Sequence, residues 1–179
     1  MTVTEIGVQV TRLSYQTPSD AFTIAMVNDA MENLALEFNN AKKRNSTTVA
    51  CTDASDWSDL PADCIGVYRV DDSEGNEIAN YTIKDGVLIN LPSVATYTIR
   101  YYTFQTSVTL VGNTPGIHVA YHNALAYWVA YKFISQKDPS NPRASQMLDG
   151  YTDRAMRANA TILGSKTRRR RFARSNDTY

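Results

Sequence analysis

The fold is decided by residues 97–136, YTIRYYTFQTSVTLVGNTPGIHVAYHNALAYWVAYKFISQ, where the spacing of hydrophobic residues changes. Tyr97, Ile99 and Tyr101 come at every second position, which is the pattern of a strand with one buried face. After the loop at 112–116, hydrophobic residues recur three and four positions apart, and this predicts a helix over about 118–136. The chain therefore combines strands and helices.

A first helix is predicted over about residues 17–44. Its start, TPSD at 17–20, offers Thr17 as N-cap, a proline at the first helical position and an acidic residue that completes a capping box. Hydrophobic residues then recur at helical spacing, namely Val27, Met31, Leu34 and Phe38. The basic residues at 42–44 suit the negative end of the helix dipole.

A β region is predicted between the first and second helices, over about residues 47–111. Turn-forming residues separate short hydrophobic segments there, with DDSEGN at 71–76 and the hairpin signal Asp85-Gly86. Short strands at regular spacing that are joined by such turns predict an antiparallel meander.

The expected fold class is α+β: a small three-helix bundle with an antiparallel β-meander inserted between the first and second helices, plus a basic C-terminal tail. The last helix is predicted over about 142–164, with Gly164 placed to end it. Residues 1–16 are predicted to form an N-terminal arm or edge strand, because hydrophobic and polar residues partly alternate there. Residues 17–165 form the main domain, and residues 166–179 form the tail.

The charge of the chain is divided unevenly along its 179 residues, although the net charge is zero. Residues 1–149 hold 10 Lys and Arg against 16 Asp and Glu, a balance of −6, whereas residues 150–179 hold 8 against 2, a balance of +6. Such asymmetry indicates a segment with a role of its own. No hydrophobic run is long enough to cross a bilayer, and the first residues do not resemble a signal peptide. We therefore expect a soluble protein of the cytoplasm that does not bind membranes.

Residues capable of catalysis are few. His118 and His122 lie four apart on a predicted helix and could share a metal, but no glutamate stands between them and the chain has no third histidine. An acidic loop holds Asp53, Asp56, Asp59 and Asp63, whose spacing does not match the helix–loop–helix calcium pattern. Cys51 and Cys64 lack zinc or redox spacing, so we expect free thiols rather than a disulfide. We expect no enzymatic activity, no catalytic or metal-binding residues and no cofactor.

Two groups of residues are candidates for binding partners. The predicted helix 118–136 is crowded with Tyr121, Tyr127, Trp128 and Tyr131, which fit either core packing or contacts between subunits. In the tail, consecutive guanidinium groups repel one another and call for a polyanion or an acidic groove on a protein. The candidate binding residues of the tail are Lys166, Arg168, Arg169, Arg170, Arg171, Phe172 and Arg174.

Several short phrases follow one another in a characteristic order over about residues 20–165. They are WSDLPAD at 57–63 before a predicted strand at 65–70, a hairpin from DGVLI at 85–89 to YTIRYY at 97–102, and IHVAYHNAL at 117–125 at the start of a helix rich in alanine and tyrosine. A break that contains proline and a second long helix complete the order. In this order the chain resembles the head–tail connector, or adaptor, proteins of tailed bacteriophages.

The resemblance implies a structural virion protein, made in the host cytoplasm and placed in the neck at the head–tail interface. Residues 17–165 would be an adaptor domain that forms a homo-oligomeric ring, commonly of twelve copies, beneath the portal protein. The ring would join the capsid to neck or tail proteins. It also implies a C-terminal segment that docks into the portal, a place that residues 167–179 occupy here. Contact of the basic run with packaged DNA in the channel is a further implication.

Two other hypotheses stay open at this stage. A nucleic-acid-binding module acting through the arginine-rich tail would show steep salt dependence of its DNA affinity. A metal-dependent hydrolase built on His118 and His122 would copurify with its metal.

Overall fold

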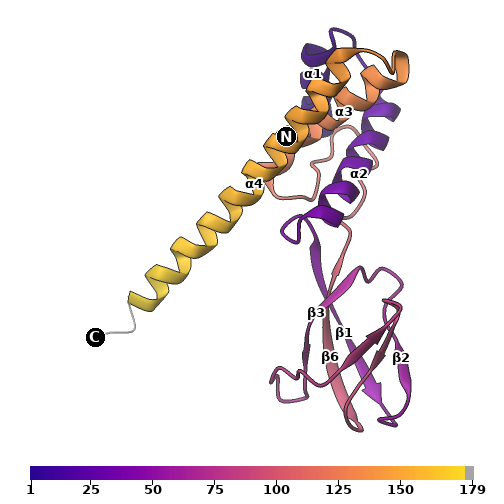
Figure 1. Cartoon of the computed structure of the whole chain (residues 1–179), viewed down its shortest axis with the longest axis vertical. Coiled ribbons are helices and arrows are strands. Elements are labelled where there is room, and N and C mark those ends of the chain that lie inside the picture. Colours follow the sequence, from indigo (N-terminus) through magenta and orange to yellow (C-terminus); the bar gives the residue numbers. More distant parts are fainter. Residues whose placement is uncertain (176–179) are drawn as a thin grey trace. The chain divides into compact units, whose positions relative to one another are not determined.

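The computed structural model describes the backbone of residues 1–175 and the side chains of residues 1–164. The described chain contains four α-helices and two small antiparallel sheets (Figure 1). It divides into two compact units, a helical unit of Met1–Ala41 and Gln105–Tyr179, and a β unit of Lys42–Phe104. The expected mixture of helices and strands is confirmed, but the expected number of three helices is wrong.

The additional helix is α1, Val3–Ser14, where the sequence predicted an extended arm or an edge strand. Thr2 and Glu5 form a capping box, in which each side chain accepts a hydrogen bond from the other residue's backbone N–H. Val3, Ile6 and Val10 are fully buried, and their spacing is that of a helix. The partial alternation of polar and hydrophobic residues resembled the two-residue period of a strand, so the three- to four-residue period of the helix was not recognised.

Helix α2, Asp20–Glu37, is shorter than predicted at both ends. Its N-cap is Ser19, which accepts from the N–H of Phe22 at 3.2 Å, rather than Thr17. The helix ends before the basic residues at 42–44, and Lys43 already belongs to the first strand, so these residues do not serve the helix dipole. The predicted buried stripe is confirmed for Val27, Met31 and Leu34.

A short 3-10 turn, η1 (Val119–Tyr121), leads into α3, His122–Lys137. Together they confirm the helix that the sequence predicted over about 118–136. Helix α3 packs against α1, α2 and the last helix, α4, Pro142–Ser175. This arrangement encloses the core of the helical unit, whose largest fully buried side chains include Tyr121, Leu125 and Val129.

The backbone of α4 stays helical past Gly164 to Ser175, so the predicted end of the helix at that glycine is wrong. The φ angle of Gly164 is not in the left-handed region where a glycine cap is needed, and a Cβ added there would meet open space. The predicted binding residues of the tail, from Lys166 to Arg174, have side chains that lie outside the described part of the structure. Residues 176–179 lie outside it altogether.

The β unit holds six strands in two three-stranded sheets, β1-β6-β3 and β2-β5-β4. The first sheet joins β1 (Lys43–Cys51), β6 (Ala95–Thr103) and β3 (Gly66–Asp71). The second joins β2 (Trp57–Asp59), β5 (Leu88–Asn90) and β4 (Thr82–Lys84). A simple meander is therefore not what forms, because β6 lies between the first and third strands of the chain.

The alternation that predicted β6 is confirmed, since Tyr97, Ile99 and Tyr101 are buried and their neighbours in the strand from Thr98 to Tyr102 are more exposed. A second hydrophobic core forms around these residues, with Val70, Ile89 and Leu91. The β unit thus has its own core, as the helical unit has.

Candidate interaction surfaces

The four aromatic residues predicted as interface candidates have different surroundings. Tyr121 is fully buried in the helical unit, where its ring lies 6.0 Å from that of Phe38 and its hydroxyl donates to Asn159 Oδ1 at 3.3 Å. Burial raises the pKa of Tyr121 to about 12. Tyr121 therefore belongs to the core, so of the two alternatives predicted for this residue the structure favours core packing over a contact between subunits.

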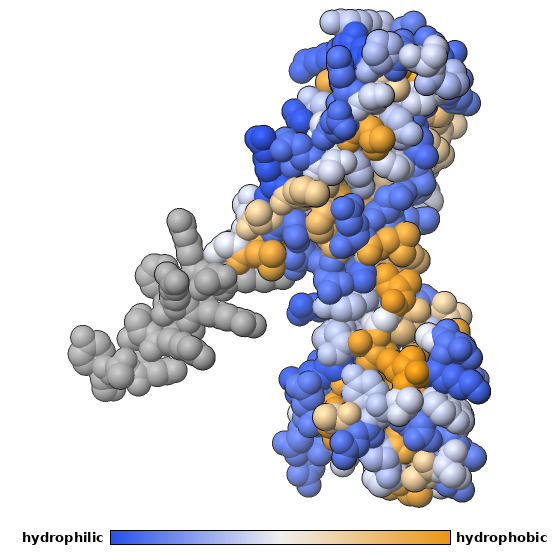
Figure 2. Space-filling view, viewed as in Figure 1, coloured by the Kyte–Doolittle hydropathy of each residue, from blue (hydrophilic) through white to orange (hydrophobic). Residues whose placement is uncertain are grey.

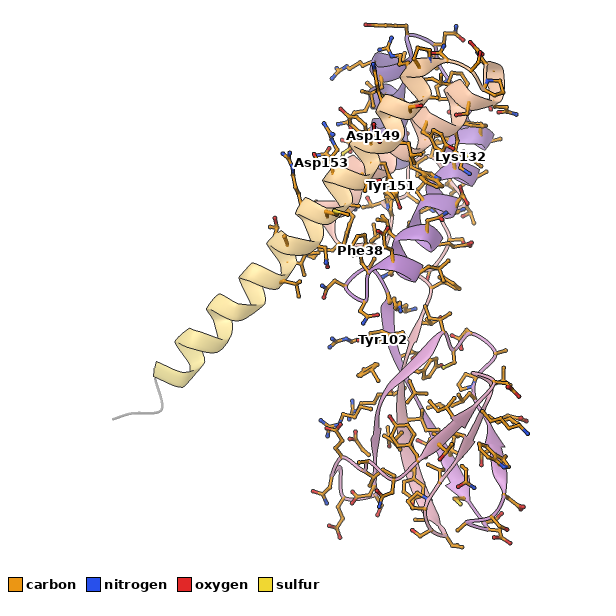
Figure 3. The ribbon with its side chains drawn as sticks, viewed as in Figure 1. Phe38, Tyr102, Lys132, Asp149, Tyr151 and Asp153 are labelled. Atoms are coloured by element: carbon orange, nitrogen blue, oxygen red, sulfur yellow. The ribbon has the colours of Figure 1, made fainter. Side chains whose placement is uncertain are left out.

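Trp128 and Tyr131 are half-buried members of a cluster that joins three helices. The indole Nε1–H of Trp128 donates to Asp29 Oδ2 of α2 at 2.7 Å, and its ring lies 4.7 Å from that of Tyr151 of α4. Lys132 lies over the Trp128 ring at 4.7 Å and pairs with Asp29 at 3.5 Å. Lys132 and Tyr151 come from neighbouring helices (Figure 3). These contacts explain the aromatic cluster mainly as packing between helices.

Tyr127, also half-buried, holds Arg154 of α4 in place. The guanidinium of Arg154 stacks on the Tyr127 ring at 3.6 Å and donates to its hydroxyl at 2.7 Å. The same guanidinium donates to the carbonyl of Gly150 at 3.2 Å. A Cβ at Gly150 would come within 2.5 Å of the Tyr127 ring, so only glycine allows this close approach of α3 and α4.

A depression of about 320 Å³ opens beside this stack, between α1, α3 and α4. It is lined by Gln9, Arg12, Leu13, Asn123, Tyr127 and Arg154. Two guanidinium groups share the depression with two amides and no carboxylate. Arg12 forms no ion pair with any residue whose side chain is described. The depression is therefore suited to an anionic group.

Sequence reasoning missed this site, because Arg12 and Arg154 are 142 positions apart and each resembles an ordinary surface charge. The one available signal was Gly150, a glycine inside a predicted helix. Such a glycine often marks a close packing contact.

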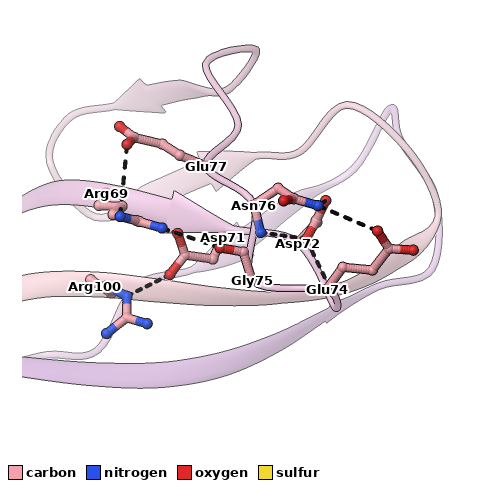
Figure 4. A network of polar contacts seen from close by, with 8 residues as sticks. All are labelled: Arg69, Asp71, Asp72, Glu74, Gly75, Asn76, Glu77 and Arg100. Atoms are coloured by element: carbon pink, nitrogen blue, oxygen red, sulfur yellow. Dashed lines mark hydrogen bonds and ion pairs between the residues drawn. The ribbon is translucent and has the colours of Figure 1, made fainter. Parts of the chain in front are cut away.

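In the β unit, Asp71 is the centre of a polar network (Figure 4). Its side chain is 1% exposed, and its two oxygens accept from Arg69 and Arg100. The hydrogen bond from Arg100, followed by that from Arg69, holds the pKa of Asp71 below its ordinary value. Arg69 also donates to the Gly75 carbonyl at 3.2 Å. The network thus ties β3 and β6 to the turn at 71–76.

Next to this network, cations lie over tyrosine rings. Lys42 lies 5.2 Å from the centre of the Tyr102 ring and Arg44 lies 5.3 Å from that of Tyr68. The two tyrosine rings are 4.7 Å apart. We call these four residues the cation–tyrosine patch.

The two histidines have engaged ring nitrogens. His122 is 4% exposed; its Nε2 lies 3.2 Å from the Ile117 carbonyl, and its Nδ1 accepts from the amino group of Met1 at 2.8 Å. Burial lowers the pKa of His122, and the positive charge of the amino terminus adds to the effect. His118 Nδ1 accepts from the N–H of Ala120 at 3.2 Å and so caps η1.

The acidic loop and the cysteines also have local roles. Asp53 accepts hydrogen bonds from the backbone and hydroxyl of Ser55, and these lower its pKa. Asp63 accepts from the Tyr101 hydroxyl at 3.3 Å. Cys51 is buried and Cys64 is half-buried, and both are free thiols. No group of three or more His, Cys, Asp or Glu within the described side chains could hold a metal ion.

Hydrophobic residues at the surface of the helical unit are scattered among hydrophilic ones in Figure 2. The exposed ones include Val8, Leu36, Leu110 and Val119. No described helix is both long and hydrophobic enough to cross a membrane.

Comparison with known proteins gives no further guide to the role of these surfaces. No protein-family model matches the chain. A search of curated proteins also finds no match.

Proposed function

We propose that the chain is a structural head–tail adaptor of a tailed bacteriophage. In this proposal, copies of the helical unit form a ring beneath the portal, and the ring joins the capsid to the neck or tail. The C-terminal end of α4 contacts the portal. The protein would thus act by assembly in the neck of the virion, and not as an enzyme.

The observation that carries the proposal is the length of α4 together with the basic residues in its last turns. The last buried residue described in α4 is Ile162, but the helical backbone continues to Ser175. At 1.5 Å per residue, residues 163–175 add about 20 Å of helix after Ile162. Lys166 and the arginines at 168–171 and 174 all belong to this extension. A long helix whose last turns carry concentrated positive charge is suited to insertion into a partner.

The chemistry of the extension indicates what the partner surface must offer. Guanidinium groups at adjacent positions repel one another, and carboxylates opposite them relieve the repulsion through charge-assisted hydrogen bonds. In a ring, the extensions would be repeated around the axis, so that several weak contacts add up. An acidic groove on the portal would meet both requirements.

Removal of the extension tests the proposal. A chain that ends at residue 165 keeps every buried residue described here, so we expect it to fold with unchanged circular dichroism per helical residue. We expect it to lose cosedimentation with the portal protein. A full-length chain with Arg168, Arg169, Arg170 and Arg171 changed to Gln separates the effect of charge from that of length. Portal binding as tight as that of the intact chain in both variants would rule out the docking role.

Binding of nucleic acid is a second candidate, favoured by the cation–tyrosine patch in addition to the arginine run. Tyrosine rings can stack on bases, and Lys42 and Arg44 could pair with phosphates. DNA affinity of the intact chain that falls steeply with salt, and that the chain ending at 165 retains in part, would support this reading. An intact chain without measurable DNA binding at low salt would eliminate it.

A further inference from the structure

Two faces of the helical unit carry exposed groups of opposite charge. The first lies on α2, a helix that holds four acidic residues along its length and no Lys or Arg. On this helix, Ala21, Ala25, Glu32 and Leu36 are exposed. Leu36 is 69% exposed, and Glu32, one turn before it, makes no ion pair with any described side chain. We call Ala21, Ala25, Glu32 and Leu36, of which Glu32 carries the charge, the acidic strip.

The second is the outer face of α1. Val8 is 49% exposed and stands one turn before Arg12, which makes no ion pair with any described side chain. A depression of about 360 Å³ surrounds Val8, and it shares Gln9 and Arg12 with the depression that also contains Arg154. We call Val8, Gln9, Arg12 and the two depressions the basic groove. Glu5 also lines this groove, but its carboxylate is engaged by the Thr2 N–H at 2.7 Å and by the nearby amino terminus.

The two faces match in spacing as well as in charge. In each, a hydrophobic residue and a charged residue are four positions apart, which is about one helical turn. If the two helices lie antiparallel, Leu36 meets Val8 while Glu32 meets Arg12. The Glu32 carboxylate would then enter the depression between Arg12 and Arg154.

The acidic strip and the basic groove point in different directions within one chain, so they cannot meet in the same copy. Helices α1 and α2 meet where Thr23 lies 3.8 Å from the position that a Cβ on Gly7 would take. Glu32 is nine residues from Thr23, or about two and a half turns, and therefore lies on the opposite side of α2. Arg12 is five residues from Gly7, about 140° around α1.

We propose that the basic groove of one copy binds the acidic strip of a second copy, with Arg12 and Arg154 around Glu32 and Val8 against Leu36. Such a contact joins two different surfaces, so it repeats head to tail and closes into a ring where the rotation allows. This inference rests on the proposed ring and names the faces that would build it.

Cysteine cross-linking tests the contact. The background carries Cys51→Ala and Cys64→Ser, so that each chain has a single introduced thiol. Chains with Val8→Cys and chains with Leu36→Cys are mixed and mildly oxidised, alone and with bound portal protein. We expect the mixed pair to cross-link several-fold more than Val8→Cys with Leu110→Cys, a control residue of similar exposure at 65%. Equal yields in the two mixtures, under both conditions, would overturn the inference.

Charge reversal is the second test of this contact. Arg12→Glu in the Val8→Cys chain should reduce the cross-link, and Glu32→Arg in the Leu36→Cys chain should restore it when the two are mixed. A reduction without restoration would indicate that Arg12 does not face Glu32. The result is separable from the portal test: loss of portal docking with a selective cross-link contradicts only the adaptor role, and docking with an unselective cross-link contradicts only this interface.

Discussion

Asp71 shows how a single side chain links the fold of the β unit to pH. Its carboxylate is nearly inaccessible to solvent and accepts from Arg69 and Arg100, and these bonds lower its pKa in the folded state. A group whose pKa is lower when folded stabilises the protein above its ordinary pKa, here 3.8. The contribution is lost as the pH falls through the folded value. We therefore expect the midpoint of thermal unfolding of the β unit to fall steeply in acid, below about pH 4.

The variant Asp71→Asn should lower this midpoint at neutral pH, because two arginines then lose their shared carboxylate. It should also flatten the acid dependence below about pH 4. Asp85→Asn is the matched control: Asp85 is an exposed hairpin residue with φ of 53°, a conformation that Asn accepts readily. An acid dependence in Asp71→Asn as steep as that of the natural chain would show that other groups cause it.

Among the helices and strands, those with an unambiguous hydrophobic period were predictable. Helix α3 and strand β6 follow from spacing alone, since every third or fourth residue in one and every second residue in the other is buried. Helix α1 was missed because Val8 and Val10 are two positions apart, which is the spacing of a strand, although only Val10 is buried. Gly164 misled in the opposite direction, since a glycine can stop a helix but also lies inside one at modest cost.

A substitution at Gly150 tests the close packing of α3 against α4. An alanine inside a helix normally stabilises it by up to about 1 kcal/mol relative to glycine. At position 150 the new Cβ would collide with the Tyr127 ring, so we expect Gly150→Ala to destabilise the helical unit by about 1–3 kcal/mol instead. Urea denaturation followed by circular dichroism at 222 nm measures the change.

The matched control is Gly164→Ala on the same helix, where nothing lies within 4 Å of the new Cβ. This change should be neutral or slightly favourable. The packing argument fails if the two alanine variants have the same stability.

The chain as a whole was predictable only in outline. The order of a helix, a β region and two further helices is visible in the sequence, but the pairing of β6 with both β1 and β3 depends on contacts between strands far apart in the chain. The candidate site was even harder to predict from the sequence. Arg12 and Arg154 come together only because α1 and α4 pack on two sides of α3, and no local pattern encodes that meeting.

The two units have separate hydrophobic cores, and this leads to an expectation for unfolding. Ile99 belongs to the core of the β unit and Leu125 to that of the helical unit, and both are fully buried. Truncation of either to alanine should cost about 2–5 kcal/mol within its own unit. Because the cores do not share residues, we expect the loss to appear mainly in one of two unfolding transitions.

The two tryptophans make this measurable, because the chain has one in each unit, Trp57 in the β unit and Trp128 in the helical unit. A chain with Trp128→Phe reports on the β unit by fluorescence, and a chain with Trp57→Phe reports on the helical unit. Ile99→Ala should shift the urea midpoint only in the first chain, and Leu125→Ala only in the second. If either truncation moved both midpoints equally, the two cores would have to unfold as one cooperative structure, and the division of the chain into independently stabilised units would be wrong.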